Sequence, residues 1–363
     1  MKKPLVIGLL LTLLFTNSSF AENPLPEEDF YISGAVKAAY INRGKEFSVA
    51  SIGWWNPSTT PTPTTTEIVQ YDLDRWTGGY EVEVGTAKLY PFGFSASFEQ
   101  QLTSFKDIKH NLPGQFNAGT SDIYFTAMGF IDQGYSKCAE EGFVINLAMS
   151  GDSREGMCTL QYDFSYMAGR MHASYEFLNE DRFKVNAFIG PAYARFYQKY
   201  KISTFGYNSN DNSEASSYTD EKLTDNLFGA SVGLAGNIKL YKNLSLNFKE
   251  MFEIFCRTSE LHATQDLINV TTLSVDYLYD TLGENDSSVG ITPHFLSRTE
   301  LAYDITKDIS ISCYYDFDLW TGLSRVVNPI IQMNTTGHSN SVHISDEEQI
   351  VSHAIGAKVA YRF

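Results

Sequence analysis

The chain has 363 residues and a formal net charge of −16, from 27 Lys and Arg against 43 Asp and Glu. This acidic balance argues against nucleic acid as a partner, because phosphate backbones require a basic surface. Hydrophobic residues make up 43% of the chain. No segment approaches the roughly 18 continuous apolar residues of a membrane-spanning helix, so helical spans are excluded.

The N-terminus is organised like a secretory signal. Lys2 and Lys3 precede a short apolar run at residues 4–15, and the small residue Ala21 ends a small-x-small cleavage site. We therefore expect export by the Sec pathway, removal of the signal peptide after Ala21, and a single mature domain over residues 22–363.

The four cysteines are too few for a disulfide scaffold in a chain of this size. Cys138 and Cys158 flank one loop-like segment and could form a disulfide in an oxidising compartment. Cys256 and Cys313 lie in strand-like runs, where we interpret them as small apolar surface residues. No metal site and no cofactor are predicted.

Alternation with a period of two dominates the chain, and long stretches of helical periodicity are hard to find. The pattern predicts strands with one apolar face and one small or polar face. A phase change after residues 160–166 predicts a bulge at Ala168-Gly169. Between residues 103 and 157 the pattern is weak, and the strand number stays open there. The clearest stretches lie at 30–40, 69–84, 92–99, 160–166, 183–189, 228–248, 309–319 and 351–363.

The connections between the strands alternate in length. Short turns are expected at 179–181, 241–243 and 306–308, and long polar loops at about 205–225, 259–288 and 325–348. This rhythm is typical of outer-membrane barrels, which have short periplasmic turns and long extracellular loops. A soluble sandwich has no reason to sort its loops by length. We predict an all-β fold, a transmembrane antiparallel β-barrel of about 12 strands, with 10 or 14 as alternatives.

The final segment, residues 351–363, predicts how the barrel closes. Its apolar residues alternate and end on an aromatic carboxyl terminus, with Val359, Tyr361 and Phe363 on the face expected to meet lipid. This ending resembles the C-terminal signal strand of Gram-negative outer-membrane barrels, which implies recognition by the barrel-assembly machinery. Taken alone, the segment could also be an edge strand of a soluble sandwich.

Several stretches resemble the pore-forming family of the Legionella major outer membrane protein. The matching pieces are TLQYDFSYMAGRMHASYEF, FKVNAFIGPAYARF, FGASVGLAGNIKLYKNLSLNF and ITPHFLSRTELAYDITKDISISCYYDF, which lie within the C-terminal 200 residues or so. The resemblance implies an outer-membrane pore. The N-terminal third departs from this pattern, and its YINRG and GWW segments look like another porin group.

If the apolar faces meet lipid, the opposite faces supply the lumen with more acids than bases. Acidic rings favour cations, so we expect a weakly cation-selective channel for small hydrophilic solutes or ions in the outer membrane. The pore-lining candidates are Asp72, Asp74, Glu81, Glu83, Glu99, Asp163, Lys239, Lys249, Glu253, Arg298, Glu300, Asp316, Asp318, Lys358 and Arg362, together with Lys37.

Two other functions stay open. The charges could pair across strands and fill a narrow barrel, giving a non-conducting structural or adhesive barrel. An outer-membrane hydrolase is a remote alternative, because such sites are not local in sequence. Since no catalytic motif or histidine constellation is present, we do not expect an enzyme. The expected partners are outer-membrane lipid and lipopolysaccharide, the assembly machinery and small solutes or cations; a homo-oligomer is an open alternative.

Overall fold

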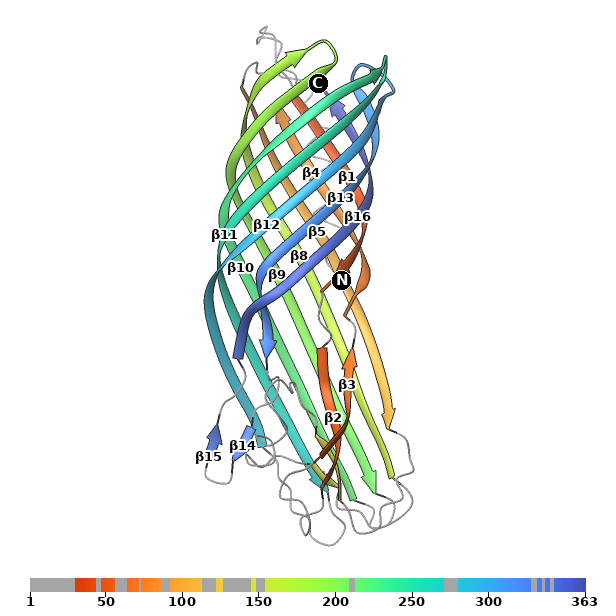
Figure 1. The fold of residues 1–363 in the computed structure, drawn as a ribbon, viewed down its shortest axis with the longest axis vertical. Helices are drawn as coiled ribbons and strands as arrows, with labels where there is room; N and C mark the ends of the chain where they lie inside the picture. Colours follow the sequence, from red (N-terminus) through yellow and green to blue (C-terminus); the bar gives the residue numbers. More distant parts are fainter. Residues whose placement is uncertain are drawn as a thin grey trace, which may run out of the picture.

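A computed structural model gives the structure of the protein. It describes residues 30–43, 47–55, 64–71, 73–86, 92–112, 122–126, 145–147, 154–208, 213–270, 280–327, 332–334, 337–339 and 343–363. Ten strands form a closed antiparallel barrel in the order β1-β16-β13-β12-β11-β10-β9-β8-β5-β4 (Figure 1). They are β1 (Phe30–Asn42), β4 (Arg75–Thr86), β5 (Phe92–Leu112), β8 (Arg154–Glu180), β9 (Phe183–Asn208), β10 (Ser213–Tyr241), β11 (Leu244–Val270), β12 (Asp280–Asp304), β13 (Ile309–Val327) and β16 (His343–Arg362).

The all-β barrel prediction is confirmed, but the wall has ten strands in place of the expected 12. Other strand-like runs lie outside the wall, in a separate four-stranded sheet ordered β3-β2-β6-β7 and a two-stranded pair. These elements are β2 (Phe47–Trp55), β3 (Thr64–Tyr71), β6 (Asp122–Thr126), β7 (Ile145–Leu147), β14 (Gln332–Asn334) and β15 (Gly337–Ser339). A search of the described residues for helices of transmembrane length and hydropathy finds none.

The barrel closes where the first described residue meets the last. The N–H of Phe30 donates to the carbonyl of Phe363 at 3.0 Å, and the N–H of Phe363 donates to the carbonyl of Phe30 at 2.9 Å. From there β1 pairs with β16 up to Asn42↔Val351, and its other edge pairs with β4. Because β1 is paired along both edges, the wall has no exposed edge at this closure.

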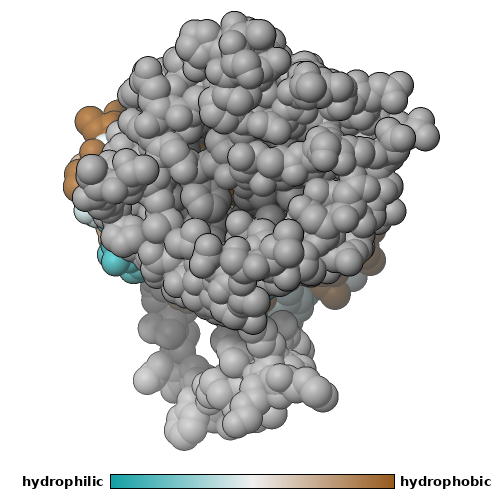
Figure 2. Space-filling model, turned by 90° about the horizontal axis from the view of Figure 1, so that it is seen from below, coloured by the Kyte–Doolittle hydropathy of each residue, from teal (hydrophilic) through white to brown (hydrophobic). Residues whose placement is uncertain are grey.

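An apolar band surrounds the outer wall next to the short turns. Val36 and Ile355, from the two strands at the closure, are 65% and 63% exposed, and apolar residues show at the left and lower right edges of the end-on view (Figure 2). Aromatic pairs mark the two limits of the band, Phe30–Phe363 stacked at 6.2 Å and Tyr40–Trp76 at 5.5 Å. Of the 13 residues of β1, the 11 from Phe30 to Tyr40 lie between them. That length matches the 9–11 residues of a transmembrane strand.

Five strands continue far beyond this band. Strands β8 to β12 contain 25 to 29 residues each. Most of the segments expected to be polar loops at 205–225 and 259–288 therefore belong to the wall. Strand pairing uses backbone hydrogen bonds, so polar residues can extend a strand as well as apolar ones. The loop prediction followed from the polar composition of these two segments, which resembles that of a loop. The turns β8–β9, β10–β11 and β12–β13 are short and lie near the C-terminus, at the upper end of Figure 1.

Strand β8 shows how the wall changes surroundings. Leu160 and Tyr166 point inward and are buried, whereas Met171 and Phe177 point outward and are exposed. The pairing of β8 with β5 and β9 has no register shift at Ala168-Gly169, so the predicted bulge is absent. The hydrophobic pattern inverts because, beyond the apolar band, the interior is packed with apolar side chains such as Leu160 and Tyr166.

Deletion of Phe363 is expected to impair assembly while leaving export intact, because it removes two closing hydrogen bonds and two aromatic stacks, with Phe30 and with Tyr361. The measurement is the amount of heat-modifiable barrel in the outer membrane. Phe92→Ala is a matched control, since Phe92 is similarly exposed and also paired with an aromatic residue, Tyr175. Normal barrel levels in the Phe363 deletion would contradict the assigned role.

Candidate functional site

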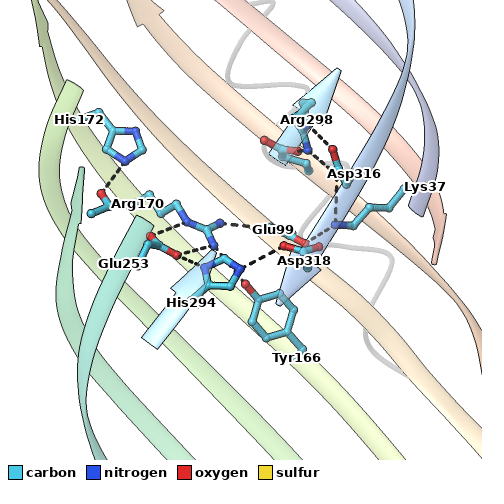
Figure 3. A network of polar contacts seen from close by, with 12 residues as sticks. Lys37, Glu99, Tyr166, Arg170, His172, Glu253, His294, Arg298, Asp316 and Asp318 are labelled. Atoms are coloured by element: carbon cyan, nitrogen blue, oxygen red, sulfur yellow. Dashed lines mark hydrogen bonds and ion pairs between the residues drawn. The ribbon is translucent and has the colours of Figure 1, made fainter. Parts of the chain in front are cut away.

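A layer of charged side chains crosses the lumen at the inner end of the apolar band (Figure 3). All of its members are at least nine-tenths buried. They project inward from β1, β4, β5, β8, β11, β12 and β13. This charge layer consists of Lys37, Glu81, Glu99, Arg170, Glu253, His294, Arg298, Asp316 and Asp318.

Arg170 holds three strands of the layer together. Its Nε and one terminal nitrogen donate to the two oxygens of Glu253 at 2.9 and 3.0 Å, and its other terminal nitrogen donates to Glu99 at 3.3 Å. The guanidinium thus binds Glu253 in a bidentate manner, which is the strong geometry for this pair. Because β8 and β11 are not neighbours in the wall, the contact bridges the lumen.

His294 lies between two carboxylates. Its Nδ1 is 2.6 Å from Oε2 of Glu253, and its Nε2 is 3.1 Å from Oδ1 of Asp318. Ionised carboxylates only accept hydrogen bonds, so the imidazolium, which donates from both nitrogens, is the form that satisfies both contacts. The ring also stacks on Trp320, with centroids 3.7 Å apart. The histidine is therefore fixed in position on three sides.

Arg298 forms the other half of the layer. It donates to both oxygens of Asp316 at 2.7 and 2.9 Å and to Glu81, across the lumen on β4, at 2.7 Å. Its guanidinium lies 4.3 Å from the centre of the Tyr314 ring. That ring lies over Gly356 on the next strand, where a Cβ would collide with it. A glycine on β16 thus allows the packing that positions Arg298.

Lys37 connects the two halves, since its ammonium pairs with Glu99 and lies 3.9 Å from Asp316. Every charge in the layer therefore has an opposite partner. Removing a charge from water costs several kcal/mol unless its partners compensate. In the charge layer the partners compensate for this cost. Because its charges are paired with one another, none of them is left to bind a solute.

An aromatic plug adjoins the layer on the side of the long strands. We define it as Tyr166, Phe196, Phe255 and Trp320, which project from β8, β9, β11 and β13. The Trp320 ring is 5.5 Å from Tyr166, 5.0 Å from Phe196 and 5.6 Å from Phe255. All four belong to one buried apolar cluster that fills this part of the barrel. A cavity of about 10 Å³ adjoins Trp320, and it is too small for a solute.

A second set of polar contacts lies beyond the plug, at the far end of β1. Arg43 pairs with Glu348 on β16, and its guanidinium also donates to Oε1 of Gln198 at 2.7 Å and to the hydroxyl of Tyr200 at 3.1 Å. Glu348 lies on the strand next to β1, whereas Gln198 and Tyr200 lie on β9, across the lumen. The lumen is therefore crossed by side-chain contacts at two heights.

On the side of the short turns the interior opens into a cavity of about 440 Å³, which we call the vestibule. Lys249, His172 and Arg298 lie at its inner end beside the charge layer. Asp304 and Arg362 lie at its rim, next to strand ends. The vestibule therefore communicates with the side of the short turns and ends at the charge layer.

The structure places the predicted pore-lining residues in four ways. In the charge layer are Glu81, Glu99, Glu253, Arg298, Asp316 and Asp318, with Lys37. Lining the vestibule are Glu83, Lys249, Glu300, Lys358 and Arg362. Outside the lumen are Asp74, Asp163 and Lys239. Outside the described residues are Asp72 and Cys138, the latter with its proposed disulfide to Cys158, and the signal peptide.

The three exceptions have physical reasons. Asp163 lies on the outer face of β8 because its neighbours Tyr162 and Phe164 occupy the packed interior. Asp74 precedes β4 and accepts hydrogen bonds from Tyr40 and the Arg43 backbone, so it fixes the end of β1. Lys239 has the inward phase but is exposed at the short-turn end of β10, where the register shifts.

Sequence reasoning missed Arg170, His172 and His294 as lumen residues. The signal was present for His294, which has the same phase as Arg298 and Glu300 on one continuous strand. Arg170 and His172 alternate with the outward Met171 in the same way. Cys256 and Cys313 are free and exposed on the outer face, as interpreted from their runs.

No protein-family model and no curated protein sequence matches the chain. Among solved structures it is similar to the outer membrane protease OmpT from Escherichia coli, with 10% identity and a TM-score of 0.44 over 92% of this chain and 97% of that one. It is also similar to a major outer membrane protein from Thermus thermophilus, with 12% identity and a TM-score of 0.30 over 92% and 99%. A third similar structure is a Pseudomonas aeruginosa FadL homologue, with 8% identity and a TM-score of 0.28 over 92% of this chain and 90% of that one. At these values neither an activity nor a family is transferred, and the Legionella family resemblance stays a prediction.

Arg170→Ala is expected to destabilise the barrel by about 3–5 kcal/mol, because it leaves Glu253 and Glu99 buried with fewer partners. The measurement is the free energy of unfolding in detergent, obtained from a denaturant titration. Lys358→Ala is the matched control, since Lys358 pairs with Glu300 at 3.3 Å near the vestibule and should cost about 0–1 kcal/mol. Equal losses in the two variants would show that the charge layer does not stabilise the wall.

Proposed function

We propose that this protein is an outer-membrane β-barrel whose lumen is closed, so that it acts as a structural or adhesive barrel and not as an open diffusion porin. The observation that carries the proposal is the pairing of the charge layer next to the buried aromatic plug. An open porin keeps its lumen polar and water-filled. Here Trp320 is 3% exposed at the middle of the interior.

An outer-membrane location is supported by the wall itself. A closed sheet satisfies all backbone groups without water, which is the condition for crossing lipid with strands. The apolar band and its aromatic limits have the dimensions of the hydrocarbon core. With the expected Sec signal, the short turns would face the periplasm, and lipid and lipopolysaccharide would surround the band.

The long strands support a role at the cell surface. About 15 residues of each of β8 to β12 extend past the band, which corresponds to wall on the order of 40 Å high at a tilt of about 40°. The outer face there is polar: Lys199 and Asp220 form an ion pair at 3.2 Å. Such a wall holds a large hydrophilic surface above the membrane, which suits contact with other molecules or surfaces.

A weakly cation-selective channel is the second candidate. It is favoured by the charge layer, in which the five carboxylates outnumber the four bases. Conduction would require the plug and at least part of the layer to move aside. We propose no enzymatic activity, because His294 is 1% exposed and both of its ring nitrogens face carboxylates.

The mature protein is expected to produce no steady open-pore current in a planar lipid bilayer. The plug and the charge layer leave no water-filled path among the described residues. Regular single-channel steps from the unmodified protein would overturn the closed-barrel proposal and favour the channel.

The double variant Phe196→Ala with Trp320→Ala is expected to conduct, because it removes two large rings from the plug. The control is the pair Phe92→Ala with Phe228→Ala, two exposed rings on the outer wall. Both variants must first show heat-modifiable folding. Failure of the folded plug variant to pass any current would show that the charge layer alone is sufficient to close the lumen.

In that conducting background, Asp316→Asn with Asp318→Asn is expected to lower the cation-to-anion permeability ratio, since it removes two of the five carboxylates of the layer. The measurement is the reversal potential in a salt gradient. An unchanged reversal potential would place these two carboxylates outside the conduction path and would count against cation selectivity.

A further inference from the structure

The vestibule contains one deep cation without a carboxylate partner. Lys249 projects inward from β11 and lines the cavity beside the charge layer. Its Nζ lies 5.4 Å from the centre of the Phe188 ring. Among the described side chains no carboxylate forms an ion pair with it, whereas all the cations of the charge layer have one.

Strand register makes this position unusual. Lys249 lies directly opposite Arg298 on the neighbouring strand, and both side chains point into the barrel. Like charges at directly opposite positions destabilise a sheet. Arg298 is paired with Asp316 and Glu81, whereas Lys249 interacts with Glu83 and Glu81 at longer range and forms no ion pair among the described side chains. Local conflicts of this kind are expected where a site serves function.

Two acids that line the vestibule together with Lys249 are already engaged. Glu83 accepts a hydrogen bond from the Tyr31 hydroxyl at 2.7 Å. Glu300 accepts from Lys358 at 3.3 Å and from Asn247 at 3.2 Å. Both carboxylates are therefore paired with groups other than Lys249, which lines the same cavity.

The same cavity offers groups that recognise hydroxyls. The side-chain oxygen of Asn186 is buried and has no hydrogen-bond partner among the described residues, so it requires a donor. Asn237 and Ser174 also line the vestibule, and the Phe188 and Phe248 rings supply apolar surface. A cavity of about 440 Å³ lies within the size range of small-molecule sites.

We propose that the vestibule binds a small carboxylate solute carrying hydroxyl groups, with Lys249 pairing with the carboxylate and Asn186 accepting from a hydroxyl. The solute enters from the side of the short turns, because the charge layer closes the other end. The site stands apart from the closed-barrel proposal, since binding does not depend on whether the lumen conducts.

The test is isothermal titration calorimetry of the purified mature barrel in detergent with glucuronate, acetate and glucose as probes. Glucuronate has both features, acetate only the carboxylate and glucose only the hydroxyls. Glucuronate should bind most tightly. Lys249→Gln should weaken it about tenfold or more, because a hydrogen bond to a charged group is lost. Lys239→Gln, an exposed lysine outside the cavity, should leave binding unchanged.

Asn186→Ala separates the two contacts. It should weaken glucuronate binding and leave acetate binding unchanged. The proposal is overturned if glucuronate gives no binding at millimolar concentration, or if Lys249→Gln binds it as tightly as the unmodified protein. Equal affinity for acetate and glucuronate would overturn the role of Asn186. Folding of each variant is checked by heat modifiability, so loss of the barrel is distinguishable from loss of the site.

Discussion

Closure of the wall with ten strands sets the width of the interior, and the rest of the structure depends on that width. Barrel diameter grows with strand number. At this width Arg298 on β12 reaches Glu81 on β4, and Arg170 on β8 reaches Glu253 on β11, although neither pair of strands is adjacent. A wider barrel would leave the same residues in water as separate charges. The narrow lumen therefore makes these charges a structural element of the interior.

The interior changes character with height while the backbone continues unchanged. Within the apolar band the charged residues point inward, among a few apolar ones such as Phe188 and Met251, and the outward residues are mainly apolar. Beyond the band, residues such as Tyr162 and Phe196 pack inside and polar residues face outward. The wall thus behaves as a membrane barrel for about half its length and as a soluble barrel with a hydrophobic core for the rest. The charge layer lies between these two parts. It separates the vestibule, on the side of the short turns, from the packed interior of the long strands.

The sequence predicts well what is local. The alternation of residues 351–363 predicted which face of β16 is apolar and exposed, because a period of two follows directly from strand geometry. The ten strands of the wall match the lower alternative and not the central value of 12, because β2 and β3 have strand-like patterns but lie outside the wall. The lengths of β8 to β12 were underestimated because their far ends carry polar residues that resemble loops. The pairings in the charge layer were not predictable. Arg298 and Glu81 are 217 positions apart, and their meeting depends on which strands face each other after closure.

The contact between Phe30 and Phe363 also constrains the order of folding. Its two partners lie at opposite ends of the described chain, so this contact has the greatest possible sequence separation and its loop-closure entropy is correspondingly high. Until it forms, β1 and β16 each present an unpaired edge that could recruit another chain. The nascent barrel therefore passes through an open sheet whose most vulnerable period ends only when its final residue is in place. Until the barrel closes, the free edges of β1 and β16 must be kept from pairing with other chains. In the closed barrel these two edges are paired with each other.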